Sequence, residues 1–293
     1  MSSTHVLRKS ARYAILLRKS MAATTRRRRD KSETALRPVH PNAGIAEAYR
    51  RKLDSLVEAM HRSVVYWLKA SYRANEPTIL AADETPADAL RRSMRGLSSQ
   101  WLKKFDEAAE NLAGYFAQSV EKRSSAALRG ILRNSGLTVE FKMTPVMRDV
   151  VDATVHQNVA LIKSIPAQYL EQVEGIVMRS VQTGRDLGQL ADDLQQRLGV
   201  TKRRAALIAR DQNNKATAAF NRVRLQEVGI DEAIWVHSGA GKEARPTHQK
   251  AGRERTRFSV SKGWFDPAVK QFIQPGELIN CRCVGRPVVK GFS

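Results

Sequence analysis

The amino-acid sequence predicts a mainly α-helical protein with three parts. A disordered basic N-terminal arm (residues 1–40) precedes an elongated multi-helix body (residues 41–229), and a small C-terminal α+β module (residues 230–293) follows. Three observations lead to this prediction. Apolar residues recur at helical spacing through the middle of the chain. Positive charge is concentrated near the N-terminal end, and the only two cysteines lie in the last part together with two of the four tryptophans.

The arm is predicted from its charge and its lack of periodicity. Residues 1–40 carry 11 Lys and Arg against 2 Asp and Glu, a net charge of 11 − 2 = +9, and they include the run Arg26, Arg27, Arg28 and Arg29. Blocks of like charge repel one another, remain solvated and commonly bind polyanions. We therefore expect the arm to bind DNA without sequence preference, since each neutralised phosphate releases counterions. A solvated tail without a partner and a targeting segment remain the alternatives, because the first 29 residues contain no acid.

The whole chain is strongly basic, with 50 Lys and Arg against 29 Asp and Glu and a formal net charge of +21. Such an excess predicts an acidic partner, which could be nucleic acid, an anionic membrane or an acidic protein surface. No apolar run approaches the roughly 18 residues of a membrane helix, so no membrane span is expected. Cys281 and Cys283 are one residue apart, a poor spacing for a disulfide, which indicates a reducing compartment.

The helical body is predicted from apolar periodicity and from helix-end signals. In its first helix the apolar residues follow one another at intervals of three or four, which places them on a single face: Ile45, Tyr49, Leu53, Leu56, Met60, Val64 and Trp67. Pro145 after Thr144 starts a later helix, Thr201 is a candidate N-cap, and Gly199 and Gly229 are candidate helix ends. Helices are expected at residues 44–73, 87–134, 145–163, 166–184, 186–198 and 202–228.

The C-terminal module differs from the body in its pattern. Residues 232–238 read as a strand followed by a Gly-rich turn, a short helix is expected near residues 246–250, and residues 278–289 read as a last strand or pair of strands. A module of this size has room for only a small core, so a metal ion would add to its stability.

His248, Cys281 and Cys283 are candidate zinc ligands, because imidazole and thiolate suit tetrahedral zinc, and His237 is a further candidate. The Cys-x-Cys spacing is tighter than in standard zinc fingers. The alternative is structural: two small cysteines buried on a strand, His248 bonded to the turn at Asn280, and an arginine, either Arg245 or Arg282, paired with Glu243. A third alternative is a Cys–His nucleophile pair formed by His248 and Cys281. No cofactor is required by the sequence, and zinc stays open.

Basic residues on the last helix of the body form a second candidate site. Arg203, Arg210 and Lys215 follow one another at spacings of seven and five, close to one helical face, where they could contact phosphate. Equally, Arg210 and Asp211 could form a buried polar link between this helix and the module. Neither a phosphate-binding Gly-rich loop nor an acidic cluster suited to two-metal phosphodiester chemistry is found, so the chain is not a packaging ATPase.

An ordered series of motifs occupies the C-terminal half. It begins with Arg204-Ala-Ala-Leu-Ile-Ala-Arg-Asp-Gln212 and continues with Trp235, Arg245-x-x-His248 and Asn280-Cys-Arg-Cys283. Through these residues the chain resembles the phage Mu F-like minor head protein family, the portal-associated head-morphogenesis proteins of tailed phages, over residues 145–290. One departure is Glu243, which stands where the family usually has an Asp-x-Arg segment. Within the series, some residues are expected to be structural: Trp235, His237, Arg245, Asn280 and Arg282.

The resemblance implies a minor capsid protein of the virion, located in the head interior near the portal vertex and in the host cytoplasm during assembly. Such a protein would act in head morphogenesis and in genome packaging or delivery, contact the portal protein or the major capsid protein, bind double-stranded DNA non-specifically and catalyse no reaction. Two other classes stay open. One is a metal-dependent nuclease or toxin-like effector with its site in residues 230–293, and the other is a nucleic-acid-binding protein without a place in the virion.

Overall fold

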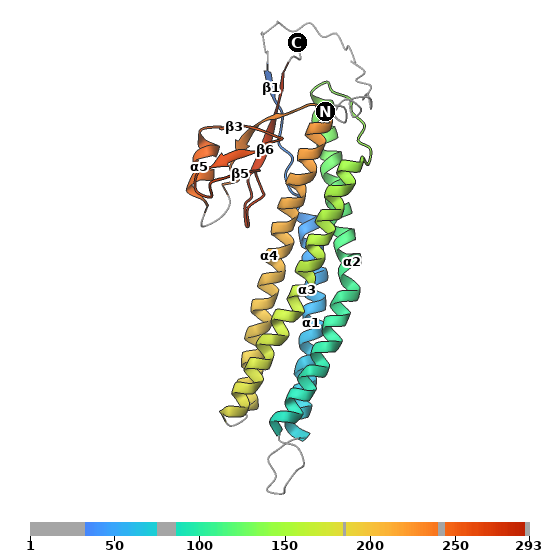
Figure 1. Ribbon diagram of the computed structural model, residues 1–293, viewed down its shortest axis with the longest axis vertical. Helices are drawn as coiled ribbons and strands as arrows, with labels where there is room; N and C mark the ends of the chain where they lie inside the picture. The colour runs from blue at the N-terminus through green and yellow to red at the C-terminus, as the bar shows by residue number, and fades with distance from the viewer. Residues whose placement is uncertain (1–32, 75–85, 184–185, 240–243, 291–293) are drawn as a thin grey trace, which may run out of the picture. The chain divides into compact units, whose positions relative to one another are not determined.

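The protein is described by a computed structural model that covers residues 33–74, 86–183, 186–239 and 244–290. These residues are mainly helical, with a group of short strands near the C-terminus, which confirms the predicted fold class (Figure 1). Arg26–Arg29 lie outside the described residues, so DNA binding by the arm stays a prediction. Among the described residues, no helix has an apolar stretch long enough to cross a membrane.

The helices of the described residues are α1 (Ala43–Ala74), α2 (Pro86–Asn134), α3 (Pro145–Gln182), α4 (Leu187–Glu227) and α5 (Pro246–Arg253). Their strands are β1 (Glu33–Ala35), β2 (Glu232–Val236), β3 (Arg257–Ser259), β4 (Trp264–Asp266), β5 (Gln271–Ile273) and β6 (Val284–Lys290).

Two predicted helix breaks are wrong, because α3 runs through Pro166 and α4 runs through Gly199. A proline inside a helix removes one backbone hydrogen bond and costs about 3 kcal/mol. Ile162, Ile165 and Tyr169 are buried on the adjoining turns, and their packing offsets that cost. Thr201, expected to cap a new helix, instead donates from its hydroxyl to the carbonyl of Arg197 within a continuous helix. Local signals for a helix end are thus overridden by packing on both sides.

The structure forms two compact units. We call residues 42–119 and 151–213 the helical unit, and the described parts of residues 1–41, 120–150 and 214–293 the sheet unit. The sheet unit therefore combines residues from both sides of the predicted domain boundary at residue 229, including the ends of α2 and α4. Its core explains this composition: Leu128 and Leu132 of α2 and Leu225 of α4 share one buried cluster with Trp235 of β2.

The helical unit is held together by an apolar core with a buried polar chain. Tyr49 of α1 stacks on Phe116 of α2, with ring centroids 4.4 Å apart. Its hydroxyl donates to Asn158 of α3 at 3.1 Å, and the amide of Asn158 donates to Gln212 of α4 at 3.1 Å. The predicted face of α1 is confirmed at four positions: Tyr49, Leu53, Met60 and Val64. It is wrong at Trp67, which is 51% exposed because the buried stripe continues through Leu68.

The sheet unit contains a four-stranded antiparallel sheet in the order β1-β6-β2-β3 and a two-stranded sheet of β4 and β5. Strand β1 corrects the prediction that residues 33–40 belong to a disordered arm. Thr34 pairs with Val289 of β6, and Leu36 and Val39 are buried in the core of the unit. The sequence signal was weak here, because the strand is only three residues long and its partner lies at the other end of the chain.

Candidate functional site

Three candidate ligands predicted from the sequence meet in the interior of the sheet unit. His248 comes from α5, while Cys281 and Cys283 lie just before β6. The Nδ1 atom of His248 is 3.5 Å from the sulfur of Cys281 and 3.7 Å from the sulfur of Cys283. Each of the three side chains is at most 5% exposed, and both cysteines are free thiols. The expected proximity of His248, Cys281 and Cys283 is therefore present in the structure.

The other ring nitrogen of His248 has a partner that the sequence did not indicate. Nε2 lies 3.2 Å from a carboxylate oxygen of Asp266, at the end of β4, and Asp266 is fully buried. A carboxylate accepts hydrogen bonds, so Nε2 carries the proton and Nδ1 presents a lone pair to the two sulfurs. The two ring nitrogens of His248 thus face Asp266 on one side and the two cysteine sulfurs on the other. His248 is oriented by Asp266.

The two thiols differ in their readiness to lose a proton. The hydrogen bond from Cys283 is the main reason that the pKa of Cys281 lies below its ordinary value, and the backbone N–H groups of Cys283 and Gly276 lower it further. The pKa of Cys283 is raised, chiefly because its thiol donates to Cys281 and also because it is buried. Cys281 is thus the thiol of the pair that loses its proton more readily, which suits it to bind a metal ion or to act as a nucleophile.

Aromatic side chains enclose the cluster. The ring of Trp235 lies edge-on to His248 at 5.0 Å between centroids and packs against Trp264 at 5.0 Å and Phe258 at 5.9 Å. Trp235 is 1% exposed. Rings in this arrangement exclude water and fix the orientation of the imidazole. The structural role of Trp235 stays a prediction, and this packing supports it.

The backbone of the cysteine segment is held by α4. The amide of Asn214 donates to the carbonyl of Cys281 at 3.0 Å, and Cys281 donates from its backbone to Leu278 at 2.9 Å. Asn280 has a φ of 60°, a left-handed conformation that asparagine adopts more readily than most residues. Gly276, with a φ of 87°, leaves little room beside Ala218 of α4, since an added Cβ would lie 3.2 Å from its methyl group. These contacts turn the segment so that both sulfurs point to His248.

The remaining motif residues surround the cluster without joining it. Arg245 precedes α5 and donates to the carbonyl of Ile279 at 3.1 Å, which ties α5 to the cysteine segment. His237 accepts a hydrogen bond from the backbone of Gly239 at 3.1 Å. An added Cβ on Gly252 would lie 2.5 Å from the Cβ of His237, so α5 can approach β2 only because residue 252 is glycine. Arg282 is partly buried, and Glu243 lies outside the described residues.

Asp266 was missed because it is far in sequence from the other three and looks like part of a turn. It stands before Pro267, and one carboxylate oxygen accepts from the backbone of Ala268 at 2.9 Å, as in other aspartate turns. The turn accounts for one oxygen only, whereas the other reaches His248. The signal available in the sequence was a carboxylate directly after the aromatic pair Trp264-Phe265, where a buried strand residue would be apolar.

The basic residues on α4 differ in their exposure to solvent. Arg203 and Arg210 are exposed, and their spacing of seven residues, about two helical turns, puts them on the same side of α4. Lys215 is half-buried, and Asp211 is buried. The structure thus leaves Arg203 and Arg210 accessible to a phosphate, while contact with DNA stays a prediction.

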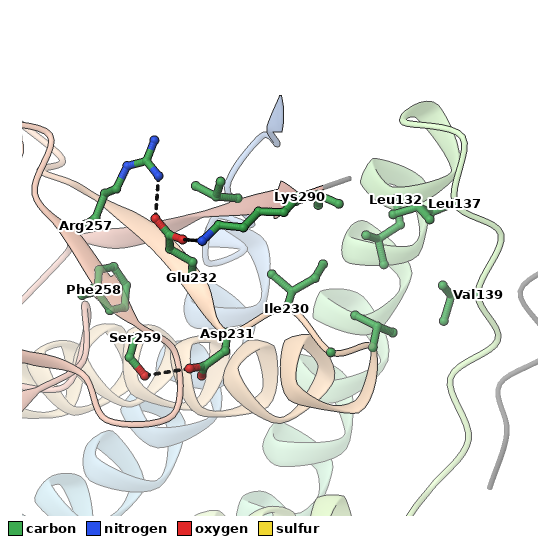
Figure 2. Close-up of a pocket in the computed structure, with 14 residues that line it drawn as sticks. Leu132, Leu137, Val139, Ile230, Asp231, Glu232, Arg257, Phe258, Ser259 and Lys290 are labelled. Atoms are coloured by element: carbon green, nitrogen blue, oxygen red, sulfur yellow. Dashed lines mark hydrogen bonds and ion pairs between the residues drawn. The ribbon is translucent and has the colours of Figure 1, made fainter. Parts of the chain in front are cut away.

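A separate cavity of about 660 Å³ lies at the edge of the main sheet (Figure 2). Apolar side chains of α2 and the sheet line it, including Leu132, Ile230 and Phe258. At its rim Glu232 binds both Arg257, at 2.6 Å, and Lys290, at 2.5 Å. None of the predicted site residues lines this cavity, so it is distinct from the His248 cluster.

Comparison with known proteins finds a family match in the part of the chain that contains the His248 cluster. Residues 171–286 match the Phage Mu protein F like family. The resemblance drawn from the motifs is thereby confirmed. The Mu F-like region contains the end of α3, all of α4 and the whole His248 cluster.

One relative of the chain is an uncharacterized protein of Haemophilus influenzae, with 32% identity over 184 residues. The aligned region covers 62% of this chain but 39% of the Haemophilus protein, so the chain spans well under half the length of that relative. No solved structure matches the chain.

Proposed function

We propose that the protein is a component of a phage head that acts in head morphogenesis and in genome packaging or delivery. The observation that carries this proposal is the match of residues 171–286 to the Phage Mu protein F like family, which takes in both α4 and the enclosed His248 cluster. The ordered motifs from Arg204 to Cys283 support the same assignment. In this role the protein contacts the portal protein or the major capsid protein and lies within the virion.

The charge of the chain supports a position beside DNA. The formal net charge is +21, and Arg203 and Arg210 are exposed on α4. A protein that neutralises phosphates in this way binds DNA of any sequence and loses affinity steeply as salt increases. The proposed contact is therefore with the DNA backbone, without base readout.

An enzymatic role is disfavoured by the burial of the groups that would carry it. Cys281 is 3% exposed and His248 is 2% exposed, and the rings of Trp235 and Trp264 pack against His248, so a macromolecular substrate has no path to them. A nucleophile or general base has to come within hydrogen-bond distance of its substrate. The geometry of the cluster suits a structural role better than catalysis.

The first test of the proposal is the composition of phage particles. In heads purified from the phage that encodes this chain, the protein should be present in a fixed number of copies and remain after density-gradient banding. Deleting its coding sequence should lower the yield of infectious, DNA-filled heads, and expression of the intact chain in trans should restore it. Normal yields of filled heads that lack the protein would contradict the proposal.

DNA binding is tested by its dependence on salt. Replacing Arg203 and Arg210 together with glutamine should reduce the slope of log affinity against log salt by about 0.9 for each phosphate that the variant no longer neutralises. A suitable control is Arg62→Gln, which removes one charge from α1, where the side chain is 71% exposed. An unchanged slope in the double variant, or an equal effect per charge in the control, would exclude a specific contribution of this face of α4.

A further inference from the structure

The cluster of His248, Cys281 and Cys283 has the geometry of a metal site. We infer that Nδ1 of His248 and the sulfurs of Cys281 and Cys283 bind one zinc ion, which fastens α5 to the segment before β6. The ligand atoms of the three residues all lie within 4.8 Å of one another, and all three side chains are buried. This inference adds a metal to the proposed head component and does not depend on its partners.

The interatomic distances match those that zinc imposes. Zinc binds thiolate sulfur at about 2.3 Å and imidazole nitrogen at about 2.0–2.1 Å, usually in a tetrahedron. Two such ligands at the tetrahedral angle lie about 3.5–3.6 Å apart. In the structure Nδ1 of His248 is 3.5 Å from the sulfur of Cys281 and 3.7 Å from that of Cys283. Each sulfur therefore stands at about the distance from Nδ1 that a shared zinc ion would impose.

Asp266 completes the arrangement expected around a zinc-binding histidine. In metal sites the ring nitrogen that does not bind the metal usually donates to a carboxylate or carbonyl, which fixes the tautomer and the ring orientation. Nε2 of His248 has such a partner in the fully buried Asp266, at 3.2 Å. The proton on Nε2 leaves the lone pair of Nδ1 directed toward the two sulfurs.

Hydrogen bonding alone explains the cluster less completely. Nδ1 of the neutral imidazole has a single lone pair, which accepts one good hydrogen bond, yet two sulfurs lie close to it. Backbone N–H groups also face the sulfurs: those of Cys283 and Gly276 approach Cys281, and that of Ser238 approaches Cys283. A zinc ion bound by all three atoms accounts for two sulfurs that converge on a single nitrogen lone pair.

The three residues supply three of the four ligands that zinc usually takes. Within the part of the chain that the structure describes, no fourth His, Cys, Asp or Glu joins the group of three. The effect of the metal is to close the chain between residue 248 and residues 281–283, which restricts the unfolded state of a unit with a small core. The metal is therefore expected to stabilise the fold.

The experiment uses the full-length chain, expressed in zinc-supplemented medium and purified without chelator. Metal analysis should find about one zinc ion per chain. After exchange, Co²⁺ should give the absorption of a tetrahedral site with sulfur-to-cobalt charge transfer, and each of Cys281→Ser and Cys283→Ser should lose about half of that charge-transfer intensity or fail to bind. His237→Ala, in the same sheet unit but outside the cluster, is the matched control and should keep one zinc.

A second variant separates metal binding from loss of fold. Asp266→Asn leaves the three ligands in place, and it should weaken zinc binding about 10–100-fold in a chelator competition while the chain remains helical by circular dichroism. In the intact protein, a chelator should lower the melting temperature and added Zn²⁺, but not Mg²⁺, should restore it. The inference is overturned if the folded chain contains no zinc and its melting temperature is insensitive to chelator. Unchanged metal affinity together with unchanged charge-transfer intensity in either serine variant would overturn it as well.

Discussion

Replacing Arg224 with methionine is expected to lower the free energy of unfolding by about 3–5 kcal/mol, because the change leaves a buried carboxylate without its partner. The side chain of Arg224 is 3% exposed, and its guanidinium lies 2.6 Å from Glu121 and 2.8 Å from Glu227. The same group donates to Ser125 and to the carbonyl of Lys142. Arg224 thus joins α4 to α2 and to the segment before α3 within the sheet unit, and urea unfolding of the full chain measures the loss.

Two further variants test whether the buried charge is the cause. Replacing Glu121 together with Arg224 by methionine should recover a substantial part of the loss, since the double variant no longer buries an unpaired Glu121. Arg257→Met is the control: its side chain also binds two carboxylates but is 51% exposed, so a loss below about 1 kcal/mol is expected. Equal losses for Arg224→Met and Arg257→Met would contradict the explanation.

The helices of this protein could be predicted largely from local sequence, and their limits show where local information ends. The apolar spacing of residues 44–73 anticipates α1 almost to the residue. Pro166 and Thr201 are residue types typical of a helix start, but no helix starts at either of them. Buried residues on both sides keep α3 and α4 continuous. The few kcal/mol that a helix-breaking residue costs is less than the free energy that several packed apolar side chains contribute. That packing cannot be predicted from a short window of sequence.

The candidate site likewise contains residues that local sequence identifies and one residue that only the fold identifies. Residue chemistry was enough to select His248, Cys281 and Cys283, because both cysteines of the chain and two of its six histidines lie in the C-terminal module. Asp266 could not be selected, since its role depends on β4 bringing it to a ring 18 residues away. Likewise β1 forms only because β6, at the far end of the chain, offers it an edge. Long-range pairing of this kind is set by the fold as a whole and leaves little trace in short segments.

The second large effect is expected for Trp235→Ala, with a loss of about 3–5 kcal/mol in the free energy of unfolding. Trp235 is 1% exposed and touches the rings of His248, Phe258 and Trp264. Removing the indole leaves a cavity at the centre of the sheet unit and takes away the surface that orients His248. Trp67→Ala is the matched control, because Trp67 is 51% exposed on α1 and its replacement should cost less than about 0.5 kcal/mol.

Trp235→Phe tests whether a smaller aromatic ring is enough to preserve stability, since it restores much of the apolar volume and keeps an aromatic face toward His248. It should be less destabilising than the alanine variant, and urea unfolding of the three variants in the same buffer gives the comparison. If Trp235→Ala were as mild as Trp67→Ala, the aromatic enclosure would contribute little to the fold. The His248 cluster would then have to be held by Asp266 and the cysteine segment alone, so these two variants decide how much the sheet unit depends on its aromatic core.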